Sequence, residues 1–179
     1  MRKIEKILIH CSDTWDEENL SKHWYKRSFH QLTETERSRV LQAVHVGIAQ
    51  INGWHAAEGF SASPSTGLHV GYHAIIRRDG VVEVARDESE AGIHCKGHNA
   101  TSLAVCLVGG KRADTFTKAQ YEALMPLVLG WLARYGLEPK QVFGHREMNP
   151  GKLCPNISNL DALRDNLEVQ YYKLSKGDK

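Results

Sequence analysis

Short apolar runs alternate with longer amphipathic segments along this chain, and that alternation limits its possible folds more than any other feature. Lys6–Cys11 and Leu103–Val108 have the length and composition of buried strands, and Gln141–Gly144 is a shorter one. Between the last two lies a helical pattern over 117–135, with Gly136 as its stop signal. Strands that alternate with helices predict an α/β fold, with a central mixed sheet flanked by helices.

Two further strands and two further helices are expected. Val70–Ile76 and Val81–Val84 flank Asp79-Gly80, a dipeptide typical of hairpin turns. Apolar residues recur on one face of Thr33–Ile51 behind an acidic first turn, which predicts a helix there. A final helix is expected over about 159–172.

Length and charge narrow the class of protein. The 179 residues suffice for one domain with a sizeable core and are few for two, so we expect a single domain over 1–179. A net charge of +2 gives no reason to expect nucleic acid as a partner. No stretch approaches the roughly 20 apolar residues that cross a bilayer, and the first apolar run is too short for a signal peptide. These features predict a monomer that is made in the cytoplasm and has no membrane partner.

The cysteines are expected to be reduced. There are four of them, Cys11, Cys95, Cys106 and Cys154. In a cytoplasmic chain, four thiols favour core residues or metal ligands over a disulfide framework. Cys106 lies in an apolar strand and is predicted to be core. Cys11 follows His10 directly, so its side chain should point to the opposite face of the strand and pack there.

Three possible metal ligands lie at or beyond strand ends. His10 ends the first strand, where an imidazole is out of place unless it lines a site. His145 directly follows Gln141–Gly144, and Cys154 comes nine positions later. Zinc binds imidazole nitrogen and thiolate sulfur, and catalytic zinc sites use three protein ligands and leave the fourth position for water. Spacing alone leaves both a metal site and hydrogen-bonded structural histidines open.

Several separate motifs occur together between residues 6 and 157. They are Ile9–Ser12, Trp54–Phe60, Val70–Gly80, Val82–Arg86, Gly92–Asn99, Ser102–Gly110, Gly144–Glu147 and Lys152–Pro155. In this order they resemble the zinc-dependent N-acetylmuramoyl-L-alanine amidases, specifically the phage lysozymes of amidase type. Those enzymes share a fold with animal peptidoglycan recognition proteins, and the resemblance implies that fold here.

The resemblance assigns roles to five residues. It makes His10, His145 and Cys154 the ligands of a Zn2+ cofactor, and it places Tyr72 and Lys152 beside the metal as catalytic residues. Negative charge develops on a carbonyl oxygen under attack, and a cation or phenol aimed at that oxygen stabilises the charge. Tyr72 could also help to move a proton to the departing amine. Residue type alone would instead favour a core aromatic and a solvated lysine.

The resemblance says less about the remaining histidines. His94 and Asn99 recur in the family's substrate groove, which implies substrate contacts. His73 adjoins Tyr72 in a predicted strand and should face the opposite side, in a structural role. His55 has no matched role, and we expect it at the surface or at a helix edge.

The implied activity is hydrolysis of the amide between N-acetylmuramic acid and L-alanine in peptidoglycan, by a phage or prophage endolysin. Without a signal peptide, the protein would reach the periplasmic cell wall only after release by a holin-like partner. One alternative is a peptidoglycan-binding module without catalysis, although non-catalytic relatives commonly lack the cysteine ligand that Cys154 would provide. Another alternative is a regulator of an intracellular protein.

The chain departs from the family's short members at about 13–53. This insertion contains the predicted helix Thr33–Ile51, and the segment Ser12–Leu20, which follows the first strand, is expected to be a loop. It could cover the groove, tune substrate choice or pack on the surface. The apolar stripe of its helix is most simply explained by core packing.

Overall fold

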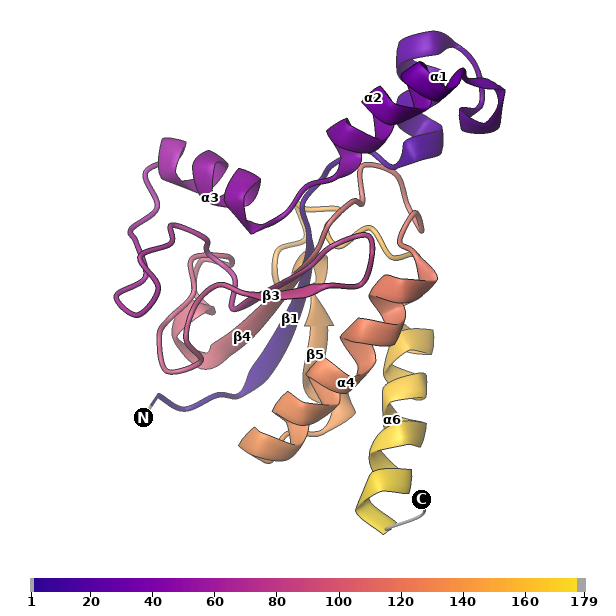
Figure 1. Ribbon diagram of the computed structural model, residues 1–179. Helices are drawn as coiled ribbons and strands as arrows, with labels where there is room; N and C mark the ends of the chain where they lie inside the picture. The colour runs from indigo at the N-terminus through magenta and orange to yellow at the C-terminus, as the bar shows by residue number, and fades with distance from the viewer. Residues whose placement is uncertain (1, 177–179) are drawn as a thin grey trace.

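Five strands form one sheet at the centre of the molecule, in the order β3-β2-β4-β1-β5 (Figure 1). The computed structural model describes residues 2–176. The strands are β1 (Lys6–Cys11), β2 (Ala74–Ile76), β3 (Val82–Val84), β4 (Ser102–Leu107) and β5 (Val142–Gly144). The helices are α1 (Glu17–Tyr25), α2 (Glu34–Val44), α3 (Ile48–Ala57), α4 (Lys118–Tyr135), α5 (His145–Met148) and α6 (Leu160–Lys176), with short 3-10 helices η1 (Phe29–Gln31), η2 (Asn99–Thr101) and η3 (Pro139–Gln141).

The pairing of the strands makes the sheet mixed. β1 pairs in parallel with β4 on one side and with β5 on the other, and β4 pairs in parallel with β2. β3 runs antiparallel to β2. The turn between them contains Gly80 at a φ of 86°, a conformation that suits glycine. The predicted hairpin and the predicted α/β fold with a mixed sheet are therefore confirmed.

Helices cover the two faces of the sheet unequally. Side chains such as Ile7 of β1 pack with Leu124 of α4 and Leu167 of α6 in the larger core, and these two helices lie side by side in Figure 1. On the opposite face, Cys106 of β4 packs with Ile51 of α3 in a smaller core. Cys106 is fully buried, as predicted. Because residues alternate along β1, His10 lies on the face opposite to Ile7 and Ile9.

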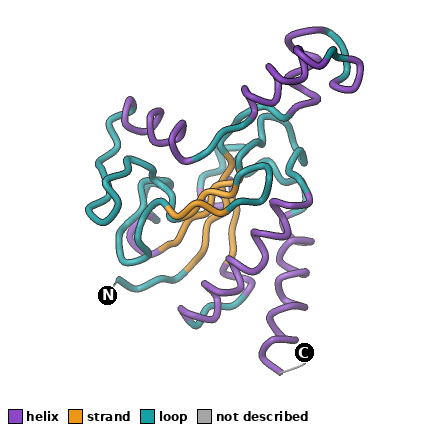
Figure 2. The backbone as a smooth tube through the Cα atoms, viewed as in Figure 1, coloured by secondary structure: helices purple, strands orange, loops and turns teal. Residues whose placement is uncertain are grey.

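The α1–α2 extension, residues 17–44, projects from one end of the sheet (Figure 2). It has a small core of its own, made by Leu20, Leu32, Val40 and Val44. Its side-chain link to the sheet region is a two-pronged ion pair, in which Arg78 Nε and an Arg78 Nη donate to the carboxylate of Glu17 at 2.9 and 2.6 Å. The start of the predicted insertion is thus a packed substructure.

The prediction of one continuous helix over Thr33–Ile51 is wrong. The structure has two helices, α2 and α3, separated by His45, Val46 and Gly47, and α3 continues to Ala57. The Glu83 carboxylate of β3 accepts the first amide of α3, from Ile48, at 2.7 Å. A Cβ on Gly47 would lie 3.1 Å from that carboxylate, so the break is set by a contact from another part of the chain.

Two smaller predictions also need correction. The segment Ser12–Leu20 is not all loop, because α1 begins at Glu17 and is capped by Asp16, which accepts the Asn19 amide at 3.0 Å. The ladder of β2 is shorter than the predicted strand Val70–Ile76 and begins at Ala74. Within residues 2–176, no helix is long and apolar enough to cross a membrane.

Candidate metal centre and active site

The two predicted histidine ligands meet because their strands are neighbours. Ile9 of β1 pairs with Gly144 of β5 in parallel, so the next residues of the two strands, His10 and His145, emerge side by side. Their ring centroids are 4.5 Å apart. Gly144 has no space for a side chain, because a Cβ there would lie 2.7 Å from Pro155. The absent side chain allows the segment that carries the third predicted ligand to approach the sheet.

Cys154 completes the predicted set. Its carbonyl accepts the Arg146 amide at 2.8 Å, and its Sγ accepts the backbone amide of Cys11 at 3.1 Å. The side chain of Cys11 is itself buried in the larger core, as predicted. Cys154 Sγ lies 3.7 Å from His10 Nδ1, and the ligand atoms of His10, His145 and Cys154 all lie within 4.8 Å of one another.

These three groups fit a zinc ion. Tetrahedral zinc with its usual bond lengths holds nitrogen and sulfur ligands about 3.3 to 3.7 Å apart, which matches the distance from His10 to Cys154. Burial and then the neighbouring imidazoles hold the pKa of His10 well below its ordinary value. Burial and the charge on Lys152 lower the pKa of His145. Both rings are therefore neutral near pH 7, as metal binding requires.

The Cys154 thiol and the two imidazoles differ in whether they must lose a proton before they can bind a metal. The neighbouring Cys11 thiol and burial together raise the pKa of Cys154. Without a cation, Cys154 therefore keeps its proton, and a metal must displace that proton to bind. The sulfur is nevertheless already positioned by the amide of Cys11, which stabilises the thiolate once it forms.

A cavity of about 550 Å³ opens over the three predicted ligands. Tyr72 and Lys152, the two predicted catalytic residues, both line it. The Tyr72 ring lies 5.1 Å from that of His10, and burial raises the pKa of its phenol well above the ordinary value, so the phenol is protonated. Other residues around the cavity are Ser12, Asp13, His55, Glu58, Phe60 and Lys111.

Residues 1–157 match the sequence profile of N-acetylmuramoyl-L-alanine amidases. The chain belongs to this family. The endolysin of Escherichia phage T7 is 43% identical to it over 118 residues, which are 63% of this chain and 72% of the endolysin. The match to the family spans all five strands and the three predicted ligands.

Solved structures show the same fold. The amidase LysC from Clostridium intestinale URNW superposes with a TM-score of 0.65 at 18% identity, over 93% of this chain and 86% of LysC. Drosophila PGRP-LB superposes with a TM-score of 0.57 at 17% identity, over 87% of this chain and 76% of PGRP-LB. The predicted likeness to amidases and peptidoglycan recognition proteins is confirmed for the fold.

Two backbone segments are in direct contact behind the residues that line one side of the amidase cavity. The Ile93 amide donates to the Gly71 carbonyl at 2.9 Å, and a Cβ on Gly71 would lie only 2.0 Å from the Ile93 carbonyl oxygen. This contact holds Tyr72 and His94, the residues that follow, on adjoining segments. The distance between these segments is therefore fixed by two peptide groups in direct contact.

The structure places the two predicted substrate contacts differently. His94 lies against the predicted metal ligand His10, with its Nδ1 3.1 Å from His10 Nε2, and it lines the cavity. Asn99 lines an adjoining hollow of about 400 Å³. Its Oδ1 accepts the amides of His94 and Cys95 at 2.9 and 2.8 Å. The side chain of Asn99 thus braces the loop that carries His94.

The expectation that His55 lies at the surface or at a helix edge misses its place in the site. It lines the cavity from α3, and its ring stacks on Phe60 with centroids 4.5 Å apart. Its Nδ1 accepts the Gly71 amide at 3.0 Å, which leaves the proton of the neutral ring on Nε2. The signal was present in the motif Trp54–Phe60, which carried no assigned role. His73 has the predicted structural role, because its Nδ1 accepts the Ala104 amide at 3.0 Å.

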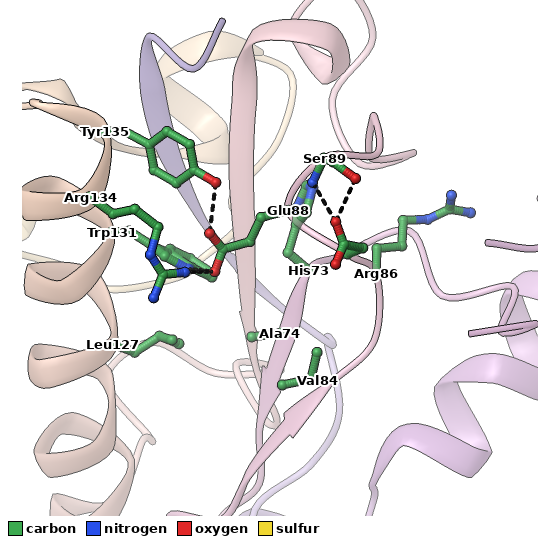
Figure 3. A pocket seen from close by; sticks show the side chains of 11 residues that line it. His73, Ala74, Val84, Arg86, Glu88, Ser89, Leu127, Trp131, Arg134 and Tyr135 are labelled. Atoms are coloured by element: carbon green, nitrogen blue, oxygen red, sulfur yellow. Dashed lines mark hydrogen bonds and ion pairs between the residues drawn. The ribbon is translucent and has the colours of Figure 1, made fainter. Parts of the chain in front are cut away.

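A second cavity, of about 380 Å³, lies away from the three ligands, between the β2–β3 hairpin and α4 (Figure 3). Beside this cavity lies the Glu88 carboxylate, which accepts from Trp131 at 2.8 Å, Tyr135 at 2.7 Å and Arg134 at 2.5 Å. These bonds tie α4 to the loop after β3. The carboxylate has its partners within the fold, so this cavity is structural.

Proposed function

We propose that this chain is a zinc-dependent endolysin that hydrolyses the amide between N-acetylmuramic acid and L-alanine. The observation that carries the proposal is the convergence of His10, His145 and Cys154 within 4.8 Å beneath a cavity lined by Tyr72 and Lys152. Two imidazoles and one thiol leave room for water or substrate at a tetrahedral ion. Membership of the amidase family and the phage endolysin relative support the same bond and the same biological role.

Lys152 and Tyr72 would each contribute to catalysis beside the metal. When bound, zinc supplies an electrophile for the scissile carbonyl and acidifies water near neutral pH. The Lys152 ammonium lowers the energy of the charge that develops on the carbonyl oxygen. Tyr72 keeps its proton because burial raises its pKa, so its phenol can donate a hydrogen bond to that oxygen or a proton to the departing amine.

The substrate would lie along the cavity and the adjoining hollow. The two share Phe60, Ile93 and His94, and the hollow adds Lys96 and Asn99. Asn99 Oδ1 is already used within the loop, so its amide nitrogen is the group that would donate to a substrate carbonyl or carboxylate. His94 would contact substrate through its ring edge.

The cellular setting follows from the same proposal. A single catalytic domain over 1–179, with the 13–53 insertion within it, would act as a monomer on periplasmic peptidoglycan. A holin-like partner would release it from the cytoplasm. Neither nucleic acid nor a membrane has a place in the reaction.

Two other functions make different predictions. A binding module would need the groove but neither the thiol nor a metal, whereas Cys154 is held beside His10 by an amide hydrogen bond from Cys11. That arrangement favours the enzyme. A regulator of an intracellular protein would instead use a surface outside the cavity, and its binding would survive the loss of Cys154.

Release of stem peptide from purified Gram-negative sacculi tests the proposal. We expect the zinc-loaded wild type to expose new L-alanine amino termini and Cys154→Ser to release them at least about a thousandfold more slowly. Cys95→Ser, at a buried cysteine outside the ligand set, is the matched control and should retain activity. If the wild type sediments with sacculi but releases no peptide, the binding module replaces the enzyme.

A further inference from the structure

A chain of hydrogen bonds runs from His10 through His94, at the edge of the cavity, to the buried Ser102. His10 Nε2 lies 3.1 Å from His94 Nδ1, and His94 Nε2 lies 3.3 Å from the Ser102 hydroxyl. That hydroxyl donates to the His98 carbonyl at 2.8 Å. Ser102 is fully buried and His10 nearly so, whereas His94 between them is half-buried and lines the cavity.

The hydrogen bond from the Ser102 hydroxyl to the His98 carbonyl determines which atom is the donor in each of the other bonds of the chain. The Ser102 hydroxyl has one hydrogen, and the His98 carbonyl can only accept it, so toward His94 the oxygen must itself accept. The proton of neutral His94 is then on Nε2, which leaves Nδ1 as an acceptor. His10 must therefore carry its own proton on Nε2, and its Nδ1 has a free lone pair. This Nδ1 is the atom that lies 3.7 Å from Cys154 Sγ.

The loop around His94 holds its ring in place. Asn99 Oδ1 accepts the amides of His94 and Cys95, which fixes the backbone on which the ring stands. A Cβ on Gly92 would lie 2.3 Å from His94 Cδ2, so only glycine permits the ring to sit there. The rings of His94 and His10 meet edge to face, at 79° with centroids 5.0 Å apart. The ring therefore has little freedom to turn.

We propose that His94 and Ser102 are positioning residues that hold His10 in the Nε2-protonated tautomer and so present its Nδ1 to the metal. The inference rests on the proposed zinc site and adds a role that substrate contact does not include. Hydrogen-bond partners of ligating histidines typically tune metal affinity by about 10- to 100-fold. His94 acts here through His10, with both of its ring nitrogens engaged, and Ser102 acts through His94.

Zinc affinity, measured by competition with a chromophoric chelator, separates this role from general stability. We expect Ser102→Ala to weaken zinc binding about 10-fold and His94→Leu about 10- to 100-fold. His94→Gln, whose amide can accept from His10 and donate to Ser102, should recover most of the loss. Ser63→Ala removes another buried hydroxyl far from the ligand set and should leave the affinity unchanged. Unchanged affinity in His94→Leu and Ser102→Ala would overturn the proposal.

A measurement on the wild type needs no variant to fold. Long-range ¹H–¹⁵N correlation spectra of the zinc-free protein report which ring nitrogen of each histidine carries the proton. We expect His10 to be protonated at Nε2, and a proton on Nδ1 would overturn the tautomer argument even if zinc still binds. If the wild type shows the expected tautomer but binds no zinc, the proposed function fails for a separate reason, and the positioning role fails with it.

Discussion

The sheet region and the α1–α2 extension differ in how far apart in the sequence their contacting residues lie. The site on the sheet draws His10, Tyr72, His145 and Cys154 from segments far apart in sequence, and they meet only when the parallel strands pair. The buried residues in the core of the extension all come from residues 20–44. A site assembled from distant segments depends on the whole fold, whereas a local core can form or melt with little effect elsewhere.

Matched leucine truncations should give the largest contrast between the two regions. Leu103 of β4 is fully buried in the larger core, and Leu103→Ala should cost about 3 to 4 kcal/mol of global unfolding free energy. Leu32→Ala should cost about 2 kcal/mol or less, because the core of the extension is small and its surroundings can collapse.

Denaturant unfolding and amide exchange check this pair together. In Leu32→Ala, we expect faster exchange confined to residues 17–44 and near-normal peptide release. In Leu103→Ala, protection should fall throughout the sheet. Equal loss of protection in both regions for either variant would mean that the extension and the sheet unfold as one unit.

Acid should weaken the sheet region before the extension, through His73. Burial lowers the pKa of His73 to about 4, so in the folded state this ring binds a proton only below that pH. The unfolded chain binds it below about 6.5, so stability falls as pH drops from 6.5 to 4, by about 2 to 3 kcal/mol in total. By contrast, Lys22 and the Phe29 amide hold the pKa of Glu18, in the extension, at about 2.

The pH dependence can be assigned with one substitution. Urea unfolding of metal-free wild type at pH 7 and pH 4.5 should show the loss, and His73→Gln should reduce the difference between the two pH values. A pH difference that is the same in His73→Gln would place the acid sensitivity in other groups.

The ion pair between Arg78 and Glu17 should give a smaller effect, on the coupling between the regions. The Arg78 side chain is largely buried and Glu17 is partly so, and we expect Arg78→Met to cost about 1 to 2 kcal/mol. The cost should appear mainly as faster amide exchange in α1 and α2. Lys22→Met removes an exposed pair with Glu18 and should change stability by less than about 0.5 kcal/mol. A larger loss of stability in Lys22→Met than in Arg78→Met would contradict the expectation that the buried pair contributes more than the exposed pair.

The same contrast explains what could be predicted from the sequence. The apolar run of β1 and the positions of His10 and His145 at strand ends carry local signals, and the family motifs add Cys154. The strand order that brings them together has no such signal in composition. The break at Gly47 was missed because Glu83, from another strand, determines it.

The role of His55 was missed for a related reason. Its place in the cavity depends on a bond from the Gly71 amide and on stacking against Phe60, and both are contacts between segments. The helix α1 was missed because it is only nine residues long and mostly polar, so the segment resembles a loop in composition. The sequence patterns gave correct predictions where the residues of one element are sufficient to determine its structure.

The backbone contact between Gly71 and Ile93 has a consequence for protein engineering. A side chain at Gly71 would break this contact, so the spacing of the segments that carry Tyr72 and His94 cannot be tuned at that position. A variant meant to accept a bulkier stem peptide is therefore better sought at lining residues that are not part of this contact, such as Glu58, Lys111 and Leu153. A library randomised at those three positions would vary the shape of the cavity and leave the backbone contact intact.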